Sequence, residues 1–222
     1  MAEMTAPGSG EAAARDTEEA AFYHEAALNA SWTGARLAIG SLSFLFGAFA
    51  FAYFYLESSD GHSKWLPSST TPPQAGYGAA IMALVVVSAI LNTVGLQLIK
   101  GGSKSSWVRS GLVALVAGLA AVALTVWQLL NLPFQPGQSG FASVFVGFYQ
   151  VALAVWFGAM VWLEILLASA RKIPGISFVE QPPTYQQAFE VQRFQASLSA
   201  FTTVWNYLAI IAFVFWLLFY VR

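Results

Sequence analysis

The sequence contains no cysteine and has few charged residues. Without cysteine, disulfides, thiolate metal sites and cysteine-bound copper are all excluded. Only 9% of its 222 residues are Asp, Glu, Lys or Arg, and 57% are hydrophobic. Soluble domains usually carry about 25% charged residues. A soluble helical bundle would need polar helix faces that this composition does not supply, so the composition favours an integral membrane protein.

Charge is also absent from four of five long apolar stretches, which are residues 37–56, 77–99, 110–132, 141–168 and 198–221. A bilayer core of about 30 Å takes about 20 residues of helix to cross, and each stretch is long enough. The sequence therefore predicts an all-α integral membrane domain of five transmembrane helices over residues 36–222. Residues 1–35 form a polar leader that we expect to be largely flexible and cytoplasmic.

The basic residues predict the orientation, because cytoplasmic loops of membrane proteins are rich in Lys and Arg. With the N-terminus inside and the C-terminus outside, eight basic residues are cytoplasmic: Arg15, Arg36, Lys100, Lys104, Arg109, Arg171, Lys172 and Arg193. Only Lys64 and Arg222 are then outside. The net charge of −1 gives no indication of nucleic-acid binding.

Small residues recur at helical spacing in the third stretch, at Gly111, Ala114, Ala117, Gly118 and Ala121. Small residues four positions apart let membrane helices approach closely. We therefore expect this helix to pack against neighbours on at least one face.

Aromatic residues mark the first and last stretches. The first carries Phe44, Phe46, Phe49, Phe51, Tyr53, Phe54 and Tyr55, and the last carries Phe213, Phe215, Trp216, Phe219 and Tyr220. For the first stretch two interpretations stay open, namely general membrane packing or a surface shared with another membrane subunit. The last turn of the final stretch is typical of the aromatic belt at a membrane interface.

Glu164 is the only acidic residue inside an apolar stretch. Ionisable groups at membrane depth are costly and so indicate function. One interpretation is a carboxylate at the cytoplasmic interface, beside Arg171 or Lys172. The other is a proton-related role, although one acid alone makes a poor relay because a relay needs a succession of polar groups.

The two histidines, His24 and His62, both lie outside the apolar stretches. Haem or copper at membrane depth takes histidine ligands from within helices. We therefore expect no catalytic residue, metal or cofactor in this chain. The polar residues left within or beside the stretches are expected to bond to neighbouring helices or water: Asn92, Gln97, Gln128, Asn131, Tyr149, Gln150, Thr202 and Asn206.

Three segments carry a resemblance to a known family. They are GSLSFLFGAFAFAYFYL (40–56), the pair VWQLLNL (126–132) and SGFASVFVGFYQVAL (139–153), and WNYLA (205–209) leading into Phe219 and Tyr220. In order and spacing they resemble subunit III of the haem–copper oxidases, the cytochrome c oxidase family, in its five-helix bacterial form. The family has a G-S-E start and A-Y-F end in the first of these helices, G-S-V-F and T-G-F-H-G-x-H in the second region, and W-H-F-V-D in the last.

The departures from that pattern all remove ionisable groups. The acid of the first helix is replaced by Leu42, and the glutamate of the family's Y-E-Y is missing within 129–131. The two histidines of G-F-H-G-x-H become Tyr149 and Ala152, and in W-H-F-V-D the histidine and the aspartate become Asn206 and Ala209.

The resemblance implies a non-catalytic subunit III of a respiratory terminal oxidase in the bacterial plasma membrane. Such a subunit packs beside subunit I, which carries haem and copper, with subunit II and other respiratory subunits nearby and possible membership of a supercomplex. It also binds phospholipid, for which Arg36, Trp205 and Asn206 are the candidate residues here. The alternatives are the equivalent subunit of a quinol oxidase or nitric oxide reductase complex, or a small transporter or assembly factor.

Overall fold

The computed structural model describes residues 9–59, 65, 71–172 and 185–221, and for 9–18, 20 and 185–187 it describes the backbone alone. This part of the chain is helical and contains no strand. Its elements are α1 (Ser9–Ser58), α2 (Ala75–Lys100), α3 (Lys104–Leu130), α4 (Gly140–Lys172), α5 (Tyr185–Trp216) and a terminal π-helical turn, η1 (Leu217–Val221). Five helices are long and apolar enough to cross a membrane, which confirms the five expected spans. His62 and the prolines of 173–184 lie outside the described residues.

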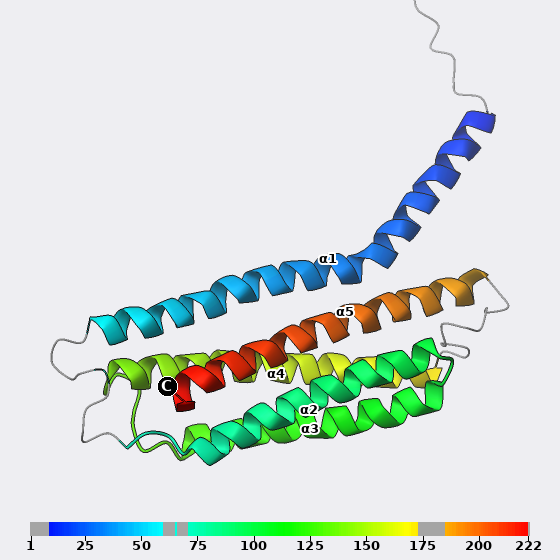
Figure 1. Ribbon diagram of the computed structural model, residues 1–222. Coiled ribbons are helices and arrows are strands. Elements are labelled where there is room, and N and C mark those ends of the chain that lie inside the picture. Colours follow the sequence, from blue (N-terminus) through cyan, green and yellow to red (C-terminus); the bar gives the residue numbers. More distant parts are fainter. Residues whose placement is uncertain (1–8, 60–64, 66–70, 173–184, 222) are drawn as a thin grey trace, which may run out of the picture.

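Helix α1 is longer than the apolar stretch that it contains. It is continuous from Ser9 to Ser58, so the boundary expected at residue 36 does not interrupt the helix. The leader is rich in Ala and Glu, which have high helix propensity. Figure 1 shows the N-terminal part of α1 turned away from the other helices. The ring of His24 nevertheless contacts Phe189 of α5, with ring centroids 4.3 Å apart. The flexibility of residues 1–35 stays a prediction.

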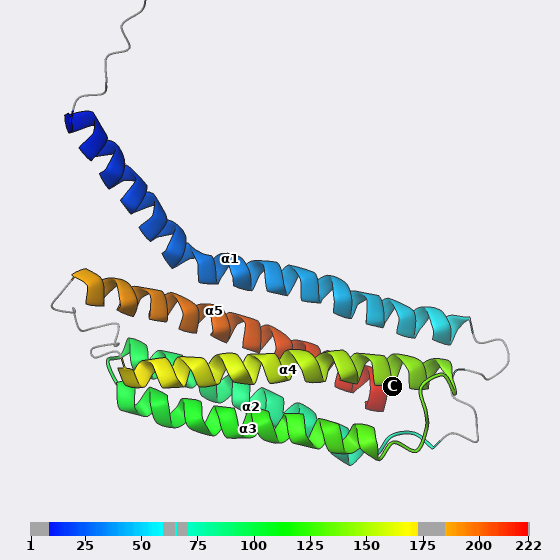
Figure 2. The same cartoon turned by 180° about the vertical axis from the view of Figure 1, so that it is seen from behind.

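The five helices alternate in direction. Helix α2 packs on α3 and α5, α3 also packs on α4, and α1 lies against α5 and α4 (Figures 1 and 2). The reversal between α2 and α3 is made by Gly101 and Gly102. The N–H of Gly101 donates to Gln97 O (3.0 Å), and Gly102 has a φ of 90°, which glycine adopts without strain.

The small residues of α3 lie on its buried face, which confirms the packing expected for this helix. Gly111, Ala114, Gly118 and Ala121 are all buried. A Cβ on Gly111 would come within 2.9 Å of Leu167 Cδ2 on α4, and one on Gly118 would overlap Met160 Sδ. These two contacts fix the register of α3 against α4.

Aromatic rings from α1, α4 and α5 form the core near one end of the bundle. Phe148 and Phe215 stack at 4.0 Å between centroids, and Phe46 lies 5.7 Å from Phe148. Phe219 is also buried, and its ring is 5.1 Å from that of Phe145. The expectation that the last turn forms an interface belt is therefore wrong for Phe219, because the π-helical turn directs that ring into the core.

The aromatic residues of α1 divide between two environments. Phe46 and Tyr53 are buried in the core, whereas Phe44, Phe51 and Tyr55 are exposed. The rings of Phe51 and Tyr55 stack on each other 5.8 Å apart on the exposed side. Packing within the bundle thus explains only part of the aromatic content of α1.

Candidate functional site

A line of buried polar side chains crosses the centre of the bundle between α2, α3 and α5. Trp205, fully buried, donates its indole N–H to Ser88 Oγ (3.1 Å), and the Ser88 hydroxyl donates to Ala114 O (2.7 Å). Ser88 and Ala114 are both fully buried where these helices meet. One serine therefore links three helices by hydrogen bonds.

One turn along α2, Asn92 continues this line. Its Nδ2 donates to Thr202 Oγ1 (2.9 Å), whose own hydroxyl donates to Leu198 O (2.8 Å). Asn92 Oδ1 is buried and has no hydrogen-bond partner in the described part of the chain. The expected bonding of Asn92 and Thr202 to neighbouring helices is confirmed.

Asn206 lies at the edge of this cluster and is half-buried. Thr93 Oγ1 is 2.9 Å from Ala89 O and 3.1 Å from Oδ1 of Asn206. One hydroxyl has one proton, so when Thr93 donates to Ala89 O the Asn206 amide is turned to donate to Thr93. In either orientation one amide atom of Asn206 remains for a partner outside the bundle.

A second polar cluster lies at the other end of the buried line. Gln128 of α3 donates from Nε2 to the Tyr220 hydroxyl, and the Tyr149 hydroxyl lies 3.3 Å from the same oxygen. Gly78 makes room for this ring, since a Cβ there would overlap Tyr220. The expected bonding of Tyr149 and Gln128 is confirmed, whereas Gln97, Asn131 and Gln150 are exposed.

Arg36 lies on the exposed side of α1, seven residues before Ser43. The Ser43 hydroxyl is 2.9 Å from the Tyr207 hydroxyl. Helices α1 and α5 run in the same direction, so Arg36 is level with Ala200 of α5. The contact of Asn206 with Thr93 then puts Arg36 near the level of Lys100, at the basic end of the bundle.

The four candidate residues are not brought together into one site. Trp205 is fully enclosed and offers no surface to a lipid, whereas Asn206 is half-buried and Arg36 is exposed. Glu164 is exposed on the opposite side, on α4. Within the described chain it forms no ion pair with Arg171 or Lys172, which lie seven and eight residues further along the helix.

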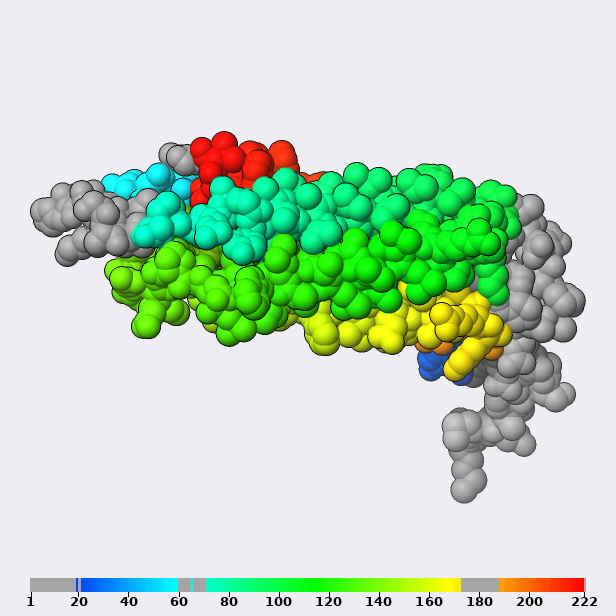
Figure 3. Space-filling model, turned by 90° about the horizontal axis from the view of Figure 1, so that it is seen from below, coloured from blue at the N-terminus to red at the C-terminus, as the bar shows by residue number. Residues whose placement is uncertain are grey.

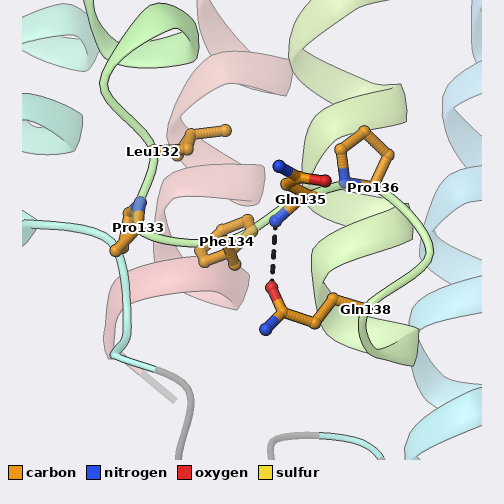
Figure 4. A pocket seen from close by; sticks show the side chains of 6 residues that line it. All are labelled: Leu132, Pro133, Phe134, Gln135, Pro136 and Gln138. Atoms are coloured by element: carbon orange, nitrogen blue, oxygen red, sulfur yellow. Dashed lines mark hydrogen bonds between the residues drawn. The ribbon is translucent and has the colours of Figure 1, made fainter.

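The hollows on the surface differ in their linings: one holds Lys104 and Arg109, another Glu190 and Arg193, and a third Glu57. The loop between α3 and α4 surrounds one of about 480 Å³, lined by Leu132, Pro133, Phe134, Gln135, Pro136 and Gln138 (Figure 4). The Gln135 N–H donates to Gln138 Oε1 (3.0 Å) across it. Over the residues that the structure describes, no three of His, Asp and Glu gather in one place.

No known family model matches the chain, and no curated protein sequence matches it. The arrangement must therefore be interpreted from its own geometry. Among the buried polar side chains that the structure describes, four are used in contacts between helices: Ser88, Asn92, Gln128 and Thr202. Sequence reasoning missed Ser88 and Thr93, because a lone hydroxyl in an apolar stretch gives no signal before its neighbour across the helix contact is known.

Proposed function

We propose that the chain is a non-catalytic subunit III of a bacterial respiratory oxidase, placed in the plasma membrane with its N-terminus inside. In this role it stabilises the haem–copper subunit I and orders lipid beside it. Haem and copper then belong to the partner subunits. The same architecture would serve a quinol-oxidizing or nitric oxide-reducing complex, because other subunits receive the electrons.

One observation carries the proposal, namely that the segments resembling the oxidase subunit pack against one another. Phe46 comes from 40–56, Phe148 from 139–153, and Phe215 from the part of α5 between WNYLA (205–209) and Phe219. Their rings form one cluster, with Phe46 lying 5.7 Å from Phe148 and 6.2 Å from Phe215. A scaffold whose role depends on its packing surface is expected to keep such residues even where ionisable groups are replaced.

The charge distribution supports the proposed orientation. Lys100, Lys104, Arg109, Arg171, Lys172 and Arg193 all belong to the helix ends at one end of the bundle. No Lys or Arg lies among the described residues at the other end. Basic residues favour the cytoplasmic side. Arg36, near the level of Lys100, is positioned to contact a lipid phosphate there, and Asn206 has one amide atom free for a lipid or a partner.

Purification from native membranes tests the proposal. The chain is tagged at its N-terminus, solubilised in mild detergent and recovered with whatever binds it. We expect haem absorbance in the visible spectrum and a large multi-helix partner chain, in amounts equal to the tagged chain. An unrelated membrane protein with the same tag is the control. A colourless preparation of the chain alone contradicts the proposed function.

A further inference from the structure

Glu164 lies deep within the bundle's apolar length, although its position in the sequence suggests the interface. Leu167 packs at Gly111 and Met160 packs at Gly118. Helices α3 and α4 run in opposite directions, so Glu164 is level with Ala114 of α3. Ala114 follows the exposed Arg109 by five residues, or about 7.5 Å along the helix, and Lys104 by about 15 Å, and lies about 5 Å from the middle of α3.

The side chain of Glu164 points away from the other four helices. It is exposed, as are Phe157 (55%), Val161 (39%) and Ile165 (57%) on the same side of α4. A Cβ on Gly158, also on this side, would meet nothing within 4 Å. Figure 2 shows α4 in front of the bundle between α1 and α3, and Figure 3 shows α3 beside it. The result is an apolar helix face with one carboxylate near its centre.

This carboxylate needs a partner, because an ionised group in hydrocarbon is costly unless it is paired. Arg171 is about 10 Å away along the helix and does not pair with it in the described chain. Lipid amines and choline groups lie at the membrane interface, outside the apolar stretch that begins at Ser110, and are the competing partners that the crosslinking test below separates. A second copy of the chain in the same orientation would bring two Glu164 side chains to one depth, where like charges repel.

We infer that the α4 face around Glu164 is the docking surface for a membrane-spanning helix of another protein. That helix carries a Lys, Arg or protonated His side chain at the depth of Ala114. Charge complementarity selects this occupant, and the small side chains of Ala154, Gly158 and Ala168 permit its close approach. The inference rests on the proposed function only in expecting that the partner is an oxidase subunit.

The test compares Glu164→Gln with Glu19→Gln in native membranes. Both changes remove one exposed carboxylate, but Glu19 lies in the N-terminal part of α1, away from the α4 face. Truncating one partner of a buried charge pair leaves the other charge unpaired. We expect recovery of the partner to fall at least about tenfold for Glu164→Gln and to stay unchanged for Glu19→Gln. Glu164→Asp, which keeps the charge, should retain part of the binding.

Photo-crosslinking locates the contact independently of affinity. A benzophenone amino acid replaces Val161, three residues before Glu164, or, as the control, Ile90 on the exposed side of α2. We expect the partner to be crosslinked from position 161 and not from 90. Normal thermal stability of the isolated Glu164→Gln chain in detergent would show that the variant folds.

The outcomes separate this inference from the proposed function. Unchanged partner recovery with Glu164→Gln overturns the docking surface, even if the partner is an oxidase. Crosslinks from 161 only to lipid or to a second copy overturn it as well. A Glu164-dependent partner that lacks haem upholds the docking surface and contradicts the proposed function.

Discussion

At the scale of single residues, the buried hydrogen bonds of this bundle differ in how completely they are satisfied. The indoles of Trp205 and Trp107 are both fully buried. Trp205 donates to Ser88, whereas Trp107 Nε1 has no hydrogen-bond partner in the described chain. A buried donor without a partner costs free energy comparable to that of a lost hydrogen bond. The two tryptophans can therefore be compared directly, because both indoles are buried and only one of them has a hydrogen-bond partner in the described chain.

We predict that Trp205→Phe destabilises the bundle by about 1 kcal/mol more than Trp107→Phe. Both changes remove similar volume and one N–H, but only the first removes a hydrogen bond, while the second removes an unsatisfied donor. The free energy of unfolding is measured by titrating the purified chains from mild detergent into dodecyl sulfate. Equal losses would show that the Trp107 N–H finds a hydrogen-bond acceptor in solution.

The difference between Trp205 and Trp107 could not be predicted from the sequence, whereas the number of spans could. Apolar length was enough to find five spans, and the small residues of α3 were enough to predict its packed face. Sequence did not reveal that Trp205 is enclosed or that Glu164 is level with Ala114. Those facts depend on the register between helices, which is set by pairs such as Gly118 with Met160 and cannot be read from one helix alone.

At the scale of the helical elements, a glycine packed against the inner side of α4 has a different role from a glycine on its exposed side. Gly118 of α3 is covered by Met160, whereas Gly158 on the exposed side of α4 has free space. Membrane helices associate through close packing of small residues rather than through the hydrophobic effect. The α3–α4 contact therefore depends on Gly118, and the bundle itself does not depend on Gly158.

We predict that Gly118→Val destabilises the isolated chain by about 1–3 kcal/mol, because the added methyl groups overlap Met160 and force α3 away from α4. Gly158→Val, its matched control, should change the stability by less than about 0.5 kcal/mol. The same dodecyl sulfate titration measures both. In native membranes the control should instead weaken partner binding, since Gly158 belongs to the docking face. A stable Gly118→Val variant would contradict the register on which the depth of Glu164 rests.

At the scale of the whole molecule, the two ends of the bundle differ in charge, while its length is almost free of charge. Helices α2 and α3 meet at Lys100 and Lys104, and α4 ends at Arg171 and Lys172. The opposite end consists of polar, proline-containing loops around Thr71 and Pro133. Such asymmetry sets the orientation during insertion, because basic residues favour the cytoplasmic side.

The absence of cysteine allows a direct test of this orientation. A single cysteine is introduced at the exposed position Ser105, near the basic end, or at the exposed position Thr71, at the other end. We predict that a membrane-impermeant maleimide labels Thr71→Cys in intact cells, and labels Ser105→Cys only after the membrane is opened. The wild-type chain has no thiol and gives the background. The reverse labelling would put the basic end outside and contradict the proposed orientation.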